Sequence, residues 1–85
     1  MEAQQHDELR AGREIVREFL RNRRLQAGLR QQDVADRLGV PQSYVSKVEL
    51  GERRVDIVEL HRYCRALGIS LADVVEGLDE ATCTR

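Results

Sequence analysis

The feature that most constrains the fold is the position of four glycines, each of which follows a segment with apolar residues at helical spacing. These are Gly28, Gly39, Gly51 and Gly68. Glycine commonly stands just after a helix because it adopts the left-handed conformation without a steric cost. Apolar residues three and four positions apart are typical of amphipathic helices. The pattern therefore predicts helices joined by tight turns, and no strand pattern or repeat interrupts it.

This spacing predicts five helices, in residues 9–26, 31–38, 41–50, 57–67 and 71–78. Pro41 fits the first turn of the third helix, where its missing N–H costs nothing. Asp56 can cap the fourth helix, and Ser70 with Asp73 forms a Ser-x-x-Asp capping box for the fifth. The residues expected on the inner faces of the first and fourth helices are Leu9, Ile15, Val16, Phe19, Leu20, Ile57, Leu60, Cys64 and Leu67.

The length and composition predict one all-α domain. The chain has 85 residues, and a second hydrophobic core would need roughly 50 more. Residues 9–78 are expected to form the domain, with a flexible N-terminal tail in residues 1–8 and a C-terminal tail in residues 79–85. An enzyme is not expected, because no nucleophile has a plausible base and orienting group nearby.

No metal, cofactor or membrane is expected either. His61 and Cys64 are three residues apart on one predicted helix, but zinc normally needs four ligands, and the other candidates, His6 and Cys83, lie near opposite ends. The N-terminus is polar and acidic, and no apolar run approaches the roughly 20 residues of a membrane span. Two distant cysteines fit a reducing compartment. The sequence therefore predicts a cytoplasmic protein.

The formal net charge of −1 conceals a strongly basic region. Residues 10–30 hold seven arginines against Glu14 and Glu18, whereas residues 1–9 and 55–85 are acidic. Such a distribution favours a nucleic-acid partner more than the net charge does. The alternative is a solvated helix face whose arginines pair with the glutamates at helical spacing.

The segment from Gln31 to Leu50 has the layout of a helix-turn-helix, because its two predicted helices are joined by a short turn at Gly39. If Val45 and Val48 pack inward, the second of these helices has one continuous outward stripe. Its members are Gln42, Ser43, Ser46, Lys47 and Leu50. Short polar side chains suit a helix in the major groove, where glutamine can pair with adenine, lysine with guanine, and serine with either.

At this point the sequence resembles the phage Cro and repressor type of helix-turn-helix domain, also called the Xre family. The resemblance spans about residues 20–78. It is carried by Arg24, Gly28-Leu29, Gln31, Val34-Ala35, Leu38-Gly39-Val40, Val45-Ser46, Glu49, Gly51, Leu60, Ala66-Leu67-Gly68, Leu71 and Val74. It implies a compact five-helix bundle that binds double-stranded DNA in a sequence-specific manner as a transcriptional regulator, commonly as a dimer on a two-fold symmetric operator.

The resemblance also assigns roles to individual residues. Gln42, Ser43 and Lys47 match positions that face bases, and Arg24 is expected to form a structural salt bridge with Glu49. Gln31 matches a position that touches phosphate, and Arg53 or Arg54 falls in a loop that also approaches phosphate. The residues themselves add Ser46, in the outward stripe, to the expected base readers and Arg30 and Tyr44 to the expected phosphate contacts. For Tyr44, partly exposed packing is the alternative.

Three positions depart from the family pattern. Arg30 stands where a Ser or Thr cap is usual, and the loss of such a cap costs on the order of 1 kcal/mol. Leu50 stands where a polar residue is common, and Val55 where Pro is common.

Two further expectations concern partners. Ile69, Leu71, Val74, Val75 and Leu78 are numerous for a terminal two-turn helix, so a homodimer through the fifth helix and the segment after it is expected. The alternative function is a protein-interaction module, or an antitoxin-like protein that binds a protein partner with the same fold. The acidic remainder of the chain and the apolar Leu50 favour that alternative.

Overall fold

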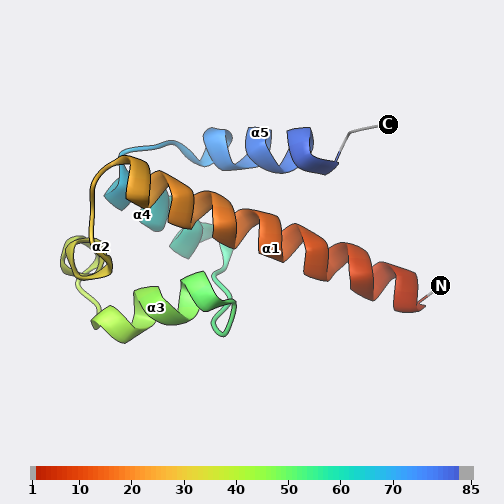
Figure 1. Ribbon diagram of the computed structural model, residues 1–85, viewed down its shortest axis with the longest axis horizontal. Helices are drawn as coiled ribbons and strands as arrows, with labels where there is room; N and C mark the ends of the chain where they lie inside the picture. Colours follow the sequence, from red (N-terminus) through yellow and green to blue (C-terminus); the bar gives the residue numbers. More distant parts are fainter. Residues whose placement is uncertain (1, 83–85) are drawn as a thin grey trace.

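The computed structural model describes residues 2–82, with side chains from residue 7 onward, and its described part consists of five helices and no strands. Figure 1 shows their arrangement. The helices are α1 (Glu2–Gln26), α2 (Gln31–Leu38), α3 (Gln42–Leu50), α4 (Ile57–Leu67) and α5 (Leu71–Thr82). The predicted all-α, five-helix bundle is therefore confirmed. No described helix is both long enough and apolar enough to cross a membrane.

The helix ends follow local signals in the sequence. The four glycines after α1 to α4 all have positive φ, between 72° and 81°. Gly39 shows why this matters: its left-handed conformation turns the chain sharply between α2 and α3, and its N–H donates to the last carbonyls of α2. The Asp56 carboxylate caps α4 by accepting the Glu59 N–H at 2.7 Å, and the Ser70 hydroxyl accepts the Asp73 N–H at 3.1 Å.

Three helix boundaries differ from the predicted ones. α1 begins at Glu2 rather than near Leu9, because good helix formers in the first residues continue the helix without a break. α5 continues to Thr82 rather than ending at Leu78, and Pro41 is the N-cap of α3 rather than its first helical residue. The limits of the domain and the flexibility of residues 1–8 stay predictions, and residues 83–85 of the expected C-terminal tail lie outside the described part.

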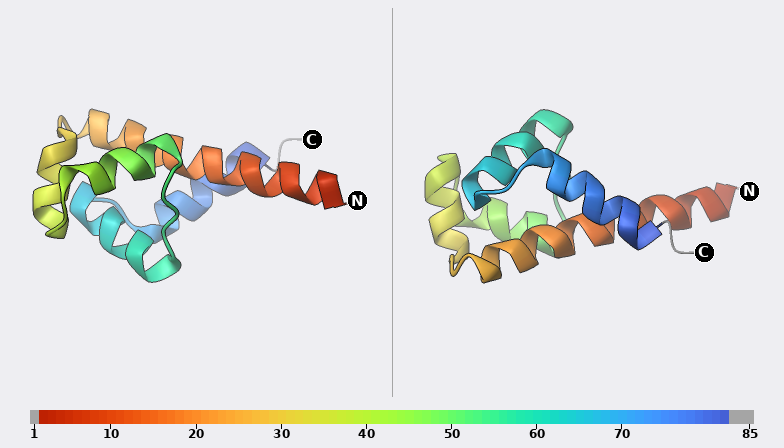
Figure 2. Two further views of the ribbon diagram at one scale, coloured as in Figure 1. Left: turned by 90° about the horizontal axis from the view of Figure 1, so that it is seen from below. Right: turned by 90° about the horizontal axis from the view of Figure 1, so that it is seen from above.

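The core lies where α1 to α5 converge. Its buried members come from every helix: Leu20, Val34, Ala35, Leu38, Val45, Val48, Tyr63, Cys64, Ala66, Leu67 and Val74. Two predicted inward residues are wrong, because Leu9 is 55% exposed and Ile57 is 68% exposed. The N-terminal part of α1, which includes Leu9, extends past α2, α3 and α4 (Figure 2). On α4, Tyr63 is fully buried and Ile57 is not.

Candidate nucleic-acid interface

The outer surface of α3 presents most of the predicted reading stripe. Val45 and Val48 are buried, as the prediction required. The side chains at Gln42, Ser43, Lys47 and Leu50 are exposed, and Ser46 is half-buried. These outward residues follow one another at helical spacing on a single face. The helix can therefore approach another surface closely along that face.

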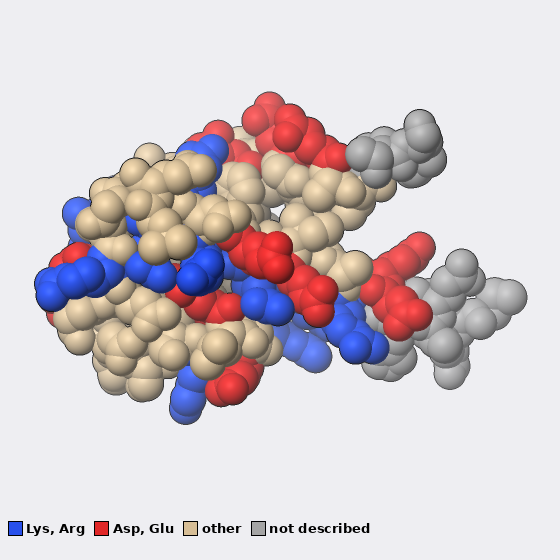
Figure 3. Space-filling view, viewed as in Figure 1, with Lys and Arg blue, Asp and Glu red and all other residues tan. Residues whose placement is uncertain are grey.

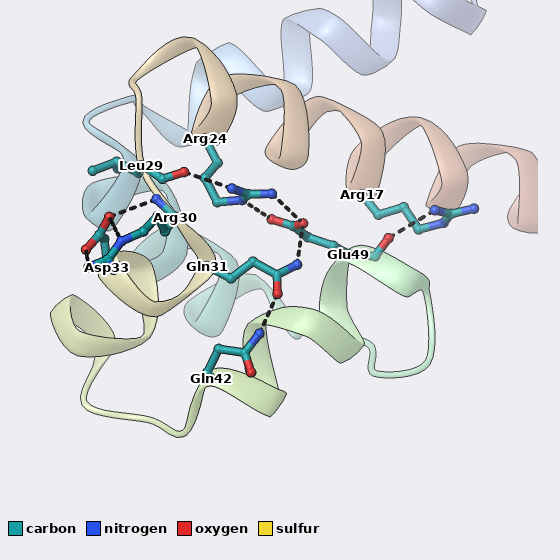
Figure 4. A network of polar contacts seen from close by, with 8 residues as sticks. All are labelled: Arg17, Arg24, Leu29, Arg30, Gln31, Asp33, Gln42 and Glu49. Atoms are coloured by element: carbon teal, nitrogen blue, oxygen red, sulfur yellow. Dashed lines mark hydrogen bonds and ion pairs between the residues drawn. The ribbon is translucent and has the colours of Figure 1, made fainter.

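A buried ion pair attaches the end of α3 to α1. Arg24 Nε donates to Glu49 Oε2 at 2.6 Å, and Nη2 donates to Oε1 at 3.0 Å. The third nitrogen, Nη1, donates to the Leu29 carbonyl at 2.8 Å. The hydrogen bond with Glu49 raises the pKa of the Arg24 guanidinium above its ordinary value. The pair expected from the sequence is thus present and places α3 relative to α1 and the α1–α2 turn (Figure 4).

The same carboxylate begins a chain of hydrogen bonds that reaches the other end of α3. Gln31 Nε2 donates to Glu49 Oε1 at 2.9 Å, and Gln42 Nε2 donates to Gln31 Oε1 (Figure 4). Because a carboxylate only accepts, the amide nitrogen of Gln31 must face Glu49, and its oxygen must face Gln42. This order fixes the orientation of both amides. Each glutamine keeps a second N–H for another partner.

Arg30 lies beside Asp33 and does not extend freely into solvent. Its Nη2 donates to Asp33 Oδ1 at 2.7 Å, and its backbone N–H donates to Oδ2 at 2.8 Å. These two contacts lower the pKa of the Asp33 carboxyl to about 2. Asp33, which is itself part of α2, thereby caps the start of the helix. Arg30, which has no acceptor atom, cannot provide the cap that Ser or Thr usually gives.

Arg53 is also paired, although it is exposed like Arg54 next to it. The Arg53 guanidinium stacks over the Tyr44 ring, 4.5 Å from its centroid, and Nη2 donates to Glu59 Oε2 at 3.0 Å. Tyr44 is half-buried and packs partly against the core. Its position is therefore compatible with both alternatives for its role, a phosphate contact and partly exposed packing.

Three arginines that the sequence did not single out donate hydrogen bonds to carbonyls at the C-terminal ends of helices. Arg17 Nη1 donates to the Glu49 carbonyl at the C-terminal end of α3, at 3.0 Å. Arg37 donates to the Ala66 carbonyl and Arg62 to the Leu38 carbonyl, which links α2 to α4. Their partners lie 24 to 32 residues away in the chain. No local signal could have identified these pairs, although a cation near a helix C-terminus is generally favourable.

The described residues include no cluster of His, Cys, Asp and Glu suited to a metal. Cys64 is buried, as expected of a small core residue, and burial raises the pKa of its thiol. The side chain of His6 and the whole of Cys83 lie outside the described part of the chain.

Comparison with known proteins identifies relatives of this architecture. The helix-turn-helix family model matches residues 20–74. An uncharacterized HTH-type transcriptional regulator of Sinorhizobium fredii, y4dJ, is 39% identical over 62 residues, which cover 73% of this chain and 79% of that protein. An XRE-family like protein from Pseudomonas syringae pv. tomato has a TM-score of 0.86 at 34% identity and covers 96% of this chain and 99% of its own. The clp gene regulator ClgR of Corynebacterium glutamicum has a TM-score of 0.74 at 32% identity, with 81% and 88% covered.

Proposed function

The chain belongs to the Xre-type helix-turn-helix family, and on this premise we propose that it binds double-stranded DNA in a sequence-specific manner as a small transcriptional regulator. It is not an enzyme, since the named relatives are transcriptional regulators. The observation that carries the proposal is the exposed polar face of α3, held in place at both ends by the Arg24, Glu49, Gln31 and Gln42 contacts. This face enters the major groove.

The residues of that face read the bases. Gln42 already donates one amide hydrogen to Gln31, and its remaining N–H and oxygen suffice for the two hydrogen bonds that adenine offers in the major groove. Lys47 donates to guanine, and Ser43 and Ser46 contact either base type through their hydroxyls. Leu50 is 62% exposed and contacts a thymine methyl or sugar.

Phosphate contacts surround α3. Gln31 has a spare N–H that donates to a phosphate at the start of α2, where the helix dipole also favours an anion. Arg54 is exposed in the α3–α4 turn, next in the chain to Arg53, whose guanidinium stacks over the Tyr44 ring. Arg30 and Arg53 exchange their carboxylate partners for phosphate on binding. These contacts supply affinity and register, whereas the α3 side chains supply specificity.

The active form is a homodimer on a two-fold symmetric operator. Val75 on α5 is 50% exposed, and Leu9 beside the open end of the bundle is 55% exposed. The exposed Val75 supports a symmetric contact through α5 and the segment after it. Sedimentation at tens of micromolar protein tests this contact, and a monomer there would refute it.

Selection of bound sites from a random duplex library, followed by fluorescence anisotropy over a salt series, tests the proposed function. The selected site should bind, with half-sites about 10 base pairs apart or a multiple of that. Gln42→Ala with Lys47→Ala should abolish the preference for that site and leave the oligomeric state unchanged. Arg65→Ala, which removes an exposed arginine of α4, is the control and should keep the preference. Absence of duplex binding at about 50 mM salt would refute the proposal, because phosphate neutralisation is strongest there.

A further inference from the structure

One face of α1 continues beyond the helices that it covers. Arg24 and Arg17 lie two turns apart on the same face of α1, and both contact Glu49 at the end of α3. Two turns before Arg17, the same face presents Arg10, and Arg13 and Arg21 lie within about 40° of Arg17 on a helix of 3.6 residues per turn. The side of α1 that packs on α3 therefore carries five arginines along its length, with Glu14 at its edge, about 60° from Arg17.

The N-terminal part of this face is open. α3 ends at Leu50, and seen from the side of α3 (Figure 2, left) no other helix lies in front of the N-terminal half of α1. Arg10 and Arg13 are exposed. Among the described residues the only ion pair on them joins Arg10 to Asp7 at 3.7 Å, with both side chains more than 70% exposed. Such a pair contributes at most about 1 kcal/mol, so it does not neutralise the face.

The charges of α1 are sorted by direction. Figure 3 shows Lys and Arg side chains in a row along the lower side of α1, toward α3 and past its end, and Asp and Glu side chains directly above them. Arg10, Arg13 and Arg17 also line one open hollow together with Arg53 and Arg54 from the α3–α4 turn, and these five arginines outnumber the three carboxylates there, of Glu8, Glu14 and Asp79. Positive charge therefore gathers on the side of the molecule from which α3 projects, next to two of the predicted phosphate contacts.

We propose that the basic face of α1, formed by Arg10, Arg13, Arg17 and Arg21, is a second contact with the DNA backbone, beyond the C-terminal end of α3. This inference rests on the proposed function. Seven residues of helix separate Arg10 from Arg17 by about 10 Å, which is comparable to the major-groove width of about 12 Å. With α3 in the groove, α1 reaches the strand that borders it. This contact adds affinity without reading sequence.

DNA suits this face better than an acidic protein does, because the face is oriented toward the side of the molecule that carries α3. The face lies on the side of α1 toward α3, whereas the acidic row lies directly above it, on the side of α1 away from α3 (Figure 3). The alternative occupant is the acidic end of α5 in a second copy, which carries Asp79 and Glu80. The two occupants are separated by measuring DNA binding and oligomeric state on the same variants.

The test compares Arg13→Gln, the double variant Arg10→Gln/Arg13→Gln and the control Arg65→Gln in the full chain. Glutamine keeps helix propensity close to that of arginine, and circular dichroism confirms that each variant folds. Anisotropy is measured from 50 to 200 mM salt on the selected duplex and on a scrambled one. Each lost phosphate contact should reduce the slope of log affinity against log salt by about 0.9. For the double variant, the loss of affinity relative to wild type should then grow about tenfold from 200 to 50 mM salt, equally on both duplexes.

The outcomes separate the two proposals. A wild type that binds no duplex overturns the proposed function and this inference with it. A wild type that binds, with both variants keeping its salt slope as Arg65→Gln does, overturns this inference alone. An unchanged slope combined with a shift from dimer to monomer assigns the face to a second copy and also overturns it.

Discussion

Replacing Arg24 with methionine should lower the free energy of unfolding by about 3–5 kcal/mol. The substitution leaves the Glu49 carboxylate 5% exposed without its cation, and Arg24 itself is only 7% exposed. Removing one partner of a buried ion pair costs about this much because the other charge stays buried. The remaining hydrogen bond from Gln31 to Glu49 places the expected value toward the lower end. The whole domain should have about 4–13 kcal/mol of stability, so the loss is a large fraction of it.

Urea unfolding followed by circular dichroism measures the effect, with three comparison variants. Arg21→Met makes the same change on an exposed position of α1 and should stay within about 0.5 kcal/mol of wild type. Glu49→Gln removes the charge but keeps an acceptor, so it should cost less than Arg24→Met. Arg24→Met with Glu49→Leu removes both charges and should be more stable than Arg24→Met alone. A loss below about 1 kcal/mol for Arg24→Met, or a double variant no more stable than it, would refute this account.

Three further predictions concern packing and acid stability. Gly77→Ala should cost about 1–3 kcal/mol, because its Cβ would lie 2.7 Å from two ring carbons of Phe19. Gly12→Ala, whose nearest neighbour would lie at 3.9 Å, should gain up to about 1 kcal/mol in the same urea measurement. Tyr63→Phe should leave stability unchanged or raise it by about 1 kcal/mol, because the buried hydroxyl has no hydrogen-bond partner among the described residues; a loss above 1 kcal/mol would contradict this. Asp33, whose pKa is lowered from 3.8 to about 2, contributes stability that is complete above pH 3.8 and lost as the pH falls through 2. Urea midpoints from pH 5 to 2 should therefore fall less for Asp33→Asn than for wild type.

The helix pattern was predictable because its signals are local. Glycines with positive φ end four helices where the sequence placed them, and the capping residues Asp56 and Ser70 act as expected. The inward stripe of α3 was also correct, since Val45 and Val48 are buried. A helical period and a cap depend only on residues within one or two turns.

The errors arose where contacts with neighbouring helices determine which residues are buried. Leu9 fits the apolar period of α1 but lies beyond the helices that could cover it, so it is exposed. On α4, Ile57 lies on nearly the same face as the fully buried Cys64 but is the first residue of the helix, so it is exposed at the helix end. An apolar period predicts that a helix has an apolar face, but it does not predict which other helix covers that face.

The polar contacts of the site were predictable only in part. The pairing of Arg24 with Glu49 came from resemblance, because these residues lie 25 positions apart in the chain. The hydrogen bond between Gln42 and Gln31, and that from Arg17 to the end of α3, had no sequence signal at all. Arg30 and Arg53 were expected to face phosphates, and the structure shows each of them hydrogen-bonded to a carboxylate, of Asp33 and Glu59.

The most direct test of the central claim is a base-pair substitution scan of the selected duplex with wild type, Lys47→Ala and Arg54→Ala. If the outward face of α3 reads bases, Lys47→Ala should weaken binding to the selected site by about 5- to 150-fold, equivalent to 1–3 kcal/mol, and should remove the preference at one base pair of each half-site. Arg54→Ala should weaken binding to every duplex alike and leave the preferences unchanged. A Lys47→Ala protein that retains the wild-type preference at every base pair would contradict the claim.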